Sequence, residues 1–330
     1  MHAAARQRLA ELAARAVSVP LHPTPVDELS RLRDALGRGQ APGAIPRLLV
    51  KRDDAIPFAM GGNKVRKMRL LVRHAIEQGA DTLITMGGVQ SNHARVTAAM
   101  AAASGLKSVL VLNGAPPEPP TGNALLQRMF GAEIVSVATR EEREPAMREA
   151  ARRLEREGRK PYVVPLGGST PEGALAYAHA FAELLEQIDP PDVIVHSTSS
   201  GGTQAGLAAG AALAGARTRI VGISADDPSP FIDGIVRELV PAIGRLAGVE
   251  GLSYEAVEVD DTFVGGGYGV PTPASTDAMY LSARTEGLLL DPVYTAKAMA
   301  GLVARVRGGE FRADHTVLFW HTGGLPALFV

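Results

Sequence analysis

The sequence predicts an α/β protein built from parallel sheets that carry helices on both faces. Short apolar runs alternate with helical patterns along most of the 330 residues, and this alternation is typical of βαβ units. Hydrophobic residues make up 46% of the chain, which is sufficient for one large core or two medium cores. No internal repeat is visible.

The expected elements follow one another in order. Residues 1–19 form an Arg- and Ala-rich helix, which is not a secretory signal because it has no apolar core segment. Strands are expected at residues 47–51, 81–86, 107–112, 133–137, 162–164, 193–196 and 219–223. Helices are expected at residues 63–79, 91–104, 123–130, 141–158 and 204–214.

Composition excludes several classes of function. The net charge is −1 with 21% charged residues, so nothing favours a nucleic acid or an anionic membrane surface as partner. The absence of cysteine excludes disulfides, thiolate metal sites and a cysteine nucleophile, and it fits a reducing compartment. No apolar stretch reaches the roughly 18–20 residues of a membrane span. We therefore expect a soluble cytoplasmic protein that has no metal site.

The first of three glycine-containing loops is Gly61-Gly62-Asn63-Lys64. We interpret Asn63 as the N-cap of the following helix. Lys64 lies toward the buried edge of that helix, at an N-terminus where the dipole disfavours a cation, and a residue that breaks local rules is a candidate functional residue. Burial and the dipole would both lower its pKa, as an imine-forming amine requires. The alternative is a surface lysine with a partly buried stem.

The helical projection separates two sets of side chains after Lys64. The apolar stripe that we expect to be buried consists of Val65, Met68, Leu71, Val72 and Ile76. The opposite face carries three arginines, Arg66, Arg69 and Arg73.

The second loop, 199–203, follows an apolar run and opens a helix. Its glycines allow close approach, and hydroxyl and free N–H groups at a helix N-terminus form an anion cradle that suits phosphate. An ordinary Gly/Ser turn is the alternative. The third loop, 87–93, also opens a helix. Ser91 and Asn92 can donate hydrogen bonds to a carboxylate, although a plain N-cap explains Ser91 equally. We interpret His93 as a packed or surface histidine rather than a catalyst.

Several spaced motifs together resemble one family. They are KRDDAIPFAMGGNKVRK (51–67), DTLITMGGVQSNHARVTAA (81–99), PYVVPLGGST (161–170), STSSGGTQAGLAAG (197–210), GYGVP (267–271), ARTEGLLLDPVYTAKAM (283–299) and HTGGLPALF (321–329). The chain resembles the D-cysteine desulfhydrase and 1-aminocyclopropane-1-carboxylate (ACC) deaminase family of pyridoxal-phosphate (PLP) enzymes, and it departs from that pattern at residues 115–120 and 226–261.

The resemblance implies a fold type II PLP enzyme with two open, twisted, parallel-sheet domains and the cofactor between them. Residues 1–64 plus 177–330 would form the large PLP-binding domain, and residues 65–176 the small domain. The family also implies a small amino acid as substrate and a homodimer.

The resemblance also implies a role for each matching residue. Lys64 would carry PLP as an imine, and Asn92 would lie near the cofactor ring and the substrate carboxylate. Ser91 would be a nucleophile or base, with His93 beside the substrate. Tyr268 and Tyr294 would line the substrate face, where one of them stacks on the ring or handles a proton. The phosphate would be held by Ser199, Ser200, Gly201, Gly202 and Thr203.

The residues at two further positions favour one reaction of this family over another. Thr295 and Thr322 would lie near the pyridine nitrogen and the substrate side chain, where ACC deaminases of this family carry glutamate and leucine. A carboxylate beside that nitrogen makes the ring a strong electron sink. A threonine makes a weaker sink, which suffices when Cβ carries a good leaving group. This pattern favours β-elimination, most simply from D-cysteine to pyruvate, hydrogen sulfide and ammonia.

Three alternatives stay open at this point. Within the family they are ACC deaminase and a lyase for L-cysteate or another β-substituted amino acid. Outside it, a non-catalytic binder of a phosphorylated small molecule would use the same glycine-rich loops.

Overall fold

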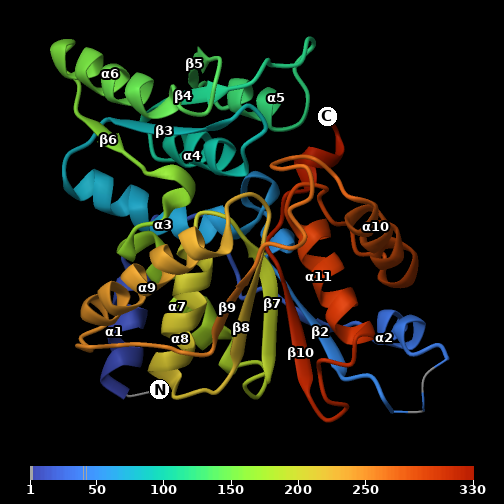
Figure 1. Ribbon diagram of the computed structural model, residues 1–330. Coiled ribbons are helices and arrows are strands. Elements are labelled where there is room, and N and C mark those ends of the chain that lie inside the picture. Colours follow the sequence, from blue (N-terminus) through green and yellow to red (C-terminus); the bar gives the residue numbers. More distant parts are fainter. Residues whose placement is uncertain (1–2, 40, 42) are drawn as a thin grey trace.

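The computed structural model describes residues 3–39, 41 and 43–330, and their strands form two separate sheets (Figure 1). The larger sheet has six strands in the order β1-β2-β10-β7-β8-β9. Its strands are β1 (Val26–Glu28), β2 (Arg47–Arg52), β7 (Val193–Thr198), β8 (Arg219–Ser224), β9 (Val257–Asp260) and β10 (Thr316–His321). The strand β1 was not among the expected strands, and it pairs antiparallel with β2 at one edge of the sheet. The other neighbours in this sheet are parallel.

Helices cover both faces of the larger sheet (Figure 1). On β10, Val317 and Phe319 face one core and Leu318 and Trp320 face another, as the two-residue period of a strand requires. The first core is closed by α2 (Ser30–Leu36), α10 (Pro273–Glu286) and α11 (Thr295–Arg307). The second is closed by α7 (Pro171–Leu185) and α8 (Gly202–Ala214), with α1 (Ala3–Ala14) and α9 (Ser229–Leu246) packed outside them.

The smaller sheet is parallel throughout and has the order β5-β4-β3-β6. Its strands are β3 (Thr82–Gly88), β4 (Lys107–Asn113), β5 (Glu133–Val137) and β6 (Pro161–Val163). The helix α4 (Asn92–Ala103) packs against Leu110 and Leu112 of β4, while α6 (Arg143–Arg156) packs against Val109 and Val111 on the other face. The chain enters this layer once and leaves it once (Figure 1).

The remaining helical segments lie between and beside these elements. They are α3 (Asn63–Glu77), α5 (Gly122–Met129) and the short 3₁₀ turns η1 (Asp53–Ala55), η2 (Phe58–Met60), η3 (Leu166–Gly168) and η4 (Leu325–Leu328). None of the helices in the described part of the chain is both long and apolar enough to span a bilayer. The α/β class and the arrangement in two open sheets are confirmed. The boundaries of the two domains stay a prediction, and the one at residues 176 and 177 falls inside α7.

Three expectations about α3 are wrong. Ile76, which was expected in the buried stripe, is 38% exposed because it lies in the last turn of the helix. Gly62, rather than Asn63, occupies the N-cap position, and Asn63 is the first helical residue. Arg66 is only 4% exposed rather than on a solvated face. It turns inward because acidic partners on η1 and α7 lie beneath α3, and periodicity along one helix contains no information about such partners.

Candidate active site

A cavity of about 430 Å³ lies between the two sheets and contains most of the predicted site residues. Those that line it are Lys64, Ser91, Asn92, His93, Ser199, Ser200, Gly201, Thr203, Tyr268, Tyr294 and Thr322. Gly202 and Thr295 were predicted with them but are not among the lining residues.

Strand register explains why residues so distant in sequence meet here. In the larger sheet, His321 at the end of β10 pairs with Arg52 at the end of β2, and Thr198 at the end of β7 pairs with Ser224 of β8. The loops that follow these strands therefore leave the sheet at one edge. Ligands bind at this carboxyl edge in open α/β sheets.

Lys64 projects into the cavity from the first turn of α3. Its Nζ lies 3.5 Å from the Gly167 carbonyl oxygen, and the described residues place no carboxylate within ion-pair distance of it. Burial lowers the pKa of the Lys64 amine from 10.5 to about 8, because desolvation disfavours the charged form. Far more of the amine is therefore neutral near physiological pH than in an ordinary lysine, as a nucleophilic amine requires.

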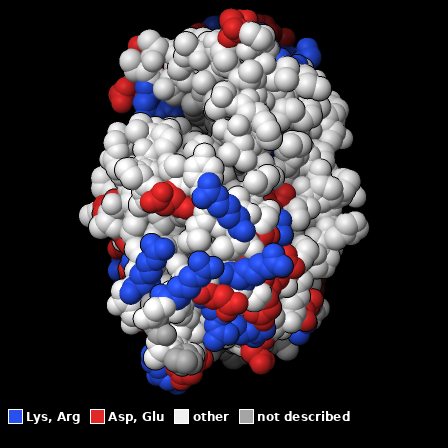
Figure 2. All heavy atoms as spheres, turned by 90° about the vertical axis from the view of Figure 1, so that its right-hand side faces the viewer, with Lys and Arg blue, Asp and Glu red and all other residues white. Residues whose placement is uncertain are grey.

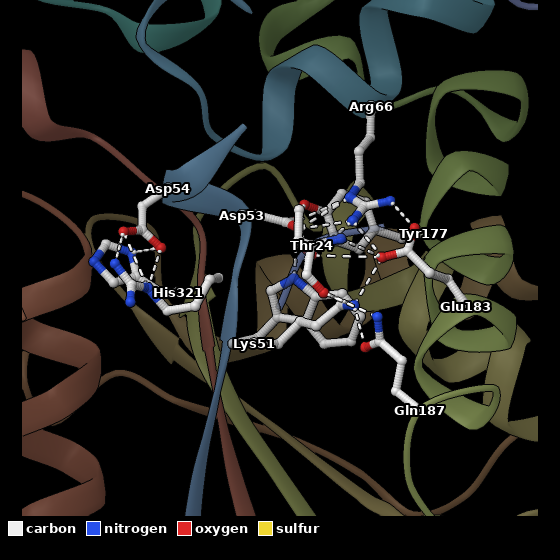
Figure 3. A network of polar contacts seen from close by, with 11 residues as sticks. Thr24, Lys51, Asp53, Asp54, Arg66, Tyr177, Glu183, Gln187 and His321 are labelled. Atoms are coloured by element: carbon white, nitrogen blue, oxygen red, sulfur yellow. Dashed lines mark hydrogen bonds and ion pairs between the residues drawn. The ribbon is translucent and has the colours of Figure 1, made fainter. Parts of the chain in front are cut away.

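A buried polar cluster beneath Lys64 anchors α3 to the larger sheet (Figure 3). Arg66 Nη2 lies 2.9 Å from Asp53 Oδ1, and its Nη1 lies 2.8 Å from Glu183 Oε2. Lys51 Nζ donates to Glu183 Oε1 at 2.7 Å, and Tyr177 Oη donates to Asp53 Oδ2 at 2.5 Å. The two cations balance the two carboxylates, so the charges are paired as buried charges must be.

Lys67 is a second buried lysine near the cavity, and the sequence reasoning missed it. Its Nζ donates to the same Gly167 carbonyl at 3.2 Å. Burial, and then the charge of Lys64, hold its pKa well below 10.5. A Cβ on Gly202 would lie only 2.8 Å from this amine, so Lys67 lies against the glycine-rich loop. Its position one helical turn after Lys64 was the available signal.

The glycine-rich loop joins β7 to α8 and fits a phosphate. Gly201 is the N-cap with φ 70°, a left-handed conformation that favours glycine. Ser169 Oγ donates to Ser200 Oγ at 2.9 Å and accepts from the Gly202 N–H at 3.2 Å. Among the described residues, the buried Ser197 hydroxyl oxygen has no hydrogen-bond partner. Unsatisfied donors at a helix N-terminus match the needs of a phosphate group.

The loop after β3 supports the predicted carboxylate site. Ser91 is the N-cap of α4 and its Oγ accepts from the Ala94 N–H at 3.2 Å, so its capping role is confirmed. Asn92 Oδ1 accepts from Arg95 Nη1 at 3.2 Å and from Asn123 Nδ2 at 2.9 Å. With the carbonyl thus occupied, the side-chain amide nitrogen of Asn92 is the group left to donate to a ligand.

Arg95 links this loop to the loop of Lys64. It is 1% exposed, and its Nη2 donates to the Gly61 carbonyl at 2.7 Å. Burial lowers the pKa of its guanidinium from 12.5 to about 10. No carboxylate in the described part of the chain forms an ion pair with it, so its charge favours an anion in the cavity.

His93 is a packed histidine, as expected, although it lines the cavity. It is 3% exposed, and its Nε2 lies 2.8 Å from Thr85 Oγ1. Burial and then the charges of Lys64 and Lys67 keep its pKa well below 6.5. The imidazole is therefore neutral at physiological pH.

Two tyrosines meet at the wall of the cavity. Tyr268 Oη and Tyr294 Oη lie 2.7 Å apart, and their rings meet edge to face with centroids 5.7 Å apart. Burial raises the pKa of both phenols, that of Tyr294 well above 10.0. Both side chains therefore keep their protons. Since one phenol donates to the other, the pair can donate one further hydrogen bond to a ligand.

Lys297 holds the loop that carries Tyr268, and it was also missed. This lysine is fully buried, and its Nζ donates to the backbone carbonyls of Val264 at 2.8 Å, Gly267 at 2.9 Å and Ala225 at 3.3 Å. It thereby ties the glycine-rich loop 265–273 to the segment that follows β8. That loop supplies Tyr268 to the cavity wall.

The two threonines that selected a reaction lie in different surroundings. Thr322 lines the cavity, and its backbone carbonyl accepts from the Asn63 N–H at 2.9 Å. Thr295 is fully buried. Its hydroxyl donates to Asp291 Oδ1 at 2.7 Å and accepts from the Asp291 N–H at 2.8 Å. The Thr295 hydroxyl is therefore occupied by Asp291 of the segment that precedes α11.

Comparisons with known proteins agree with this geometry. Residues 17–323 match the family described as pyridoxal-phosphate dependent enzyme. A D-cysteine desulfhydrase of Yersinia enterocolitica is 41% identical over 319 residues, covering 93% of this chain and 92% of the relative. A D-cysteine desulfhydrase of Serratia proteamaculans is 40% identical over 321 residues, with the same coverage of 93% and 92%.

Solved structures agree as well. A crystal structure of an ACC deaminase homologue superposes with a TM-score of 0.90 at 35% identity, covering 100% of this chain and 97% of that one. A PLP-dependent aspartate racemase, at 15% identity and a TM-score of 0.71 over 96% and 94% of the two chains, shares the fold. This chain belongs to the family of pyridoxal-phosphate dependent enzymes.

Proposed function

We propose that this protein catalyses β-elimination from a small amino acid, most simply D-cysteine, to give pyruvate, hydrogen sulfide and ammonia. The observation that carries the proposal is the amine of Lys64, which lines a cavity shared with a phosphate-type loop and a carboxylate-type loop. The two relatives named D-cysteine desulfhydrase, at 41% and 40% identity, support D-cysteine as substrate.

The residues would divide the work as follows. Ser199 to Thr203 and the N-terminus of α8 would hold the phosphate of PLP, and Lys64 would bind it covalently. When bound, PLP supplies an electron sink that makes the Cα proton of the substrate acidic. Ser91 and Asn92, at the N-terminus of α4, would orient the substrate carboxylate. Arg95 would favour the anionic ligand electrostatically without touching it.

The reaction then needs one base and one route for the leaving group. Lys64 is the base that we favour, since a pKa of about 8 suits proton abstraction near neutral pH. Tyr268 and Tyr294, both protonated, would donate a proton to the sulfur as the Cβ–S bond breaks and sulfur takes the electron pair. Addition of water to the remaining three-carbon unit releases pyruvate and ammonia.

The decisive variant is Lys64→Ala. It should abolish turnover and the visible absorption of the imine, and borohydride should no longer fix the cofactor to the protein. A variant that kept both properties would contradict the proposal. The yellow colour of the purified wild-type protein also separates it from a simple binder of a phosphorylated molecule, which forms no imine.

Two rival reactions can be separated by substrate. ACC deaminase deserves comparison because a homologue of that enzyme shares 35% identity with this chain. Pyruvate should be measured from D-cysteine, L-cysteate and ACC side by side, with sulfide measured from D-cysteine. Pyruvate from ACC without sulfide from D-cysteine would transfer the assignment to ACC deaminase.

We also propose that the enzyme is a cytoplasmic homodimer. Four exposed apolar residues at α5 and the C-terminus support an interface, namely Leu125 at 41% exposure, Met129 at 70%, Phe329 at 67% and Val330 at 66%. On the side of the molecule that Figure 2 shows, charged residues gather over the lower part, and the broad area above them carries few. Exposed apolar patches of this kind mark interaction sites. Sedimentation of wild type and Met129→Glu tests the dimer.

The proposal of a cytoplasmic location is supported by the absence of cysteine, because a chain without cysteine suits a reducing compartment.

A further inference from the structure

Arg143 is a cavity residue that the roles above do not use. It is the first residue of α6, in the smaller layer, and it lines the same cavity as Lys64. It is 8% exposed. Its Nε donates to the Arg140 carbonyl at 3.1 Å, and neither of its terminal nitrogens has a hydrogen-bond or ion-pair partner among the residues that the structure describes.

The nearest acidic groups are committed elsewhere. Arg140 Nη1 lies 2.8 Å from Asp226 Oδ2, and Arg140 Nη2 lies 2.9 Å from Asp227 Oδ1. These contacts join the smaller layer to the segment after β8, and they neutralise the aspartates that Arg143 faces. Arg140 is itself a like charge. Arg143 therefore feels these carboxylates only at a distance and forms no ion pair of its own within the described structure.

The position of Arg143 is energetically unfavourable for a charged side chain. A cation at the N-terminus of a helix opposes the helix dipole, and burial without a partner disfavours a charge. Arginine does not escape the cost by losing its proton, because its pKa lies far above the physiological range. A residue that breaks two local rules at the wall of an active-site cavity is a candidate for ligand binding.

The α-carboxylate of an amino acid does not require this group. The loop of Ser91 and Asn92 already supplies donors at a helix N-terminus for it, and Arg95 lies behind that loop. Arg143 belongs to a different wall, where its charge interacts with the Tyr268 phenol. An anion that reaches Arg143 must therefore come from the side chain of the substrate.

We propose that Arg143 determines substrate specificity by binding an oxyanion on the substrate side chain, so that amino acids with a carboxylate or sulfonate on Cβ bind more tightly than their uncharged counterparts. This inference rests on the proposed function, because it assigns a substrate class to the same cavity. A planar guanidinium donates two parallel hydrogen bonds to two oxygens of such a group. A single sulfur atom cannot accept them in that way.

Amino acids with an oxyanion on Cβ include one, cysteate, from which the enzyme can eliminate a leaving group. In cysteate the Cα proton passes to the base, the Cβ–S bond breaks, and sulfur leaves with the electron pair as sulfite. Water then converts the remaining unit to pyruvate and ammonia. No oxidant or reductant is needed, so the step balances with the same residues that serve D-cysteine.

Binding should be measured with an isosteric pair that does not eliminate. Aspartate and asparagine differ only in the side-chain oxyanion, and both enantiomers of each would be titrated into the holoenzyme by calorimetry. We expect wild type to bind aspartate roughly ten to a hundred times more tightly than asparagine, as loss of a charged hydrogen bond predicts. Arg143→Gln should abolish that preference, and Arg143→Lys should restore part of it.

A matched control lies on the same helix. Arg152 is exposed and pairs with Glu149 at 2.8 Å, away from the cavity. Arg152→Gln removes the same charge and should keep the preference for aspartate. An equal preference in wild type and Arg143→Gln, or equal affinity of wild type for both ligands, would overturn the inference.

Turnover separates this inference from the proposed function. Arg143→Gln should lower kcat/KM for cysteate at least tenfold, mainly through KM, and should change kcat/KM for neutral β-chloroalanine far less. If kcat/KM falls equally for cysteate and β-chloroalanine, the role of Arg143 in specificity is wrong, while the proposed β-elimination stands. If wild type forms no pyruvate from any of these substrates or D-cysteine, the proposed function fails, and the calorimetric preference still reports on Arg143.

Discussion

The hydroxyl groups of Tyr268 and Tyr294 lie 2.7 Å apart although 26 residues separate them in sequence. Tyr268 comes from the loop 265–273, and Tyr294 immediately precedes α11. One phenol donates to the other, so only one proton of the pair remains available to a substrate. The two residues should therefore act as one unit.

This relationship predicts non-additive effects of mutation. Tyr294→Phe or Tyr268→Phe should each lower kcat for D-cysteine by roughly 10²–10⁴, the range of a lost acid–base group. The double variant should be little worse than the more damaged single variant, because residues that act together are not additive. Sulfide release is the measurement, with thermal unfolding as the control for folding. If the decreases in kcat of the two single variants multiplied in the double variant, the tyrosines would act independently.

Lys297 should matter through the loop that it holds. Lys297→Met removes the donor of three backbone carbonyls, one of them in a buried contact, so the free energy of unfolding should fall by about 2–4 kcal/mol. Hydrogen exchange should accelerate at residues 264–269 more than at β7. Because Tyr268 is then poorly placed, kcat should fall as well. Unchanged exchange in this loop would contradict the positioning role.

Glu183 predicts a specific loss of stability in acid. Burial alone would raise the pKa of its carboxyl, but the hydrogen bonds and charge of Arg66, with the charge of Lys51, lower it from 4.5 to about 2. The folded state thus binds a proton less readily than the unfolded state. Its stabilisation, on the order of 3 kcal/mol, is present above about pH 5 and is lost as the pH falls toward 2.

Urea unfolding of wild type and Glu183→Gln between pH 7 and pH 2.5 measures this dependence. The variant should be less stable by about 3–5 kcal/mol at pH 7, since it breaks a buried ion pair. The difference should narrow steadily as the pH falls below 5. A difference that stayed constant with pH would mean that Glu183 titrates normally.

Lys64 predicts the pH dependence of cofactor loading. Because burial lowers its pKa from 10.5 to about 8, the neutral amine should become predominant above pH 8. The rate at which apoenzyme binds PLP covalently should rise with pH to a plateau, with a midpoint near 8, in stopped-flow absorption. A midpoint near 10.5 would show that the amine is not desolvated.

Gly202 provides a test of the phosphate loop. A Cβ at this position would lie 2.6 Å from Ser169 Oγ and 2.8 Å from Lys67 Nζ, so Gly202→Ala should displace the loop and weaken PLP binding about tenfold or more. Gly234→Ala is the matched control, because a Cβ there meets nothing within 4 Å. That variant should bind PLP normally and gain about 0.5–1 kcal/mol of stability within α9. Equal PLP affinity in the two variants would exclude a close role for the loop.

The sequence by itself determined the α/β class, the order of most strands and helices in the first two thirds, and the three loops that bear the chemistry. These features are local: an apolar run, a glycine at a turn and a helix N-terminus can each be recognised from neighbouring residues. Because parallel strands direct their carboxyl ends to one edge, the loops containing Lys64 and Ser199 could be expected to meet.

Only the tertiary structure decided which charges are buried and which are unpaired. Arg66 seemed to belong to a solvated helix face, and it is buried because Asp53 and Glu183 approach from η1 and α7. Lys297 carried no local signal, and the place of Arg143 in the first turn of a helix did not reveal its burial, since the surroundings of both residues come from segments distant in sequence. Burial and charge balance are properties of several segments packed together, and helical periodicity reports on one segment at a time.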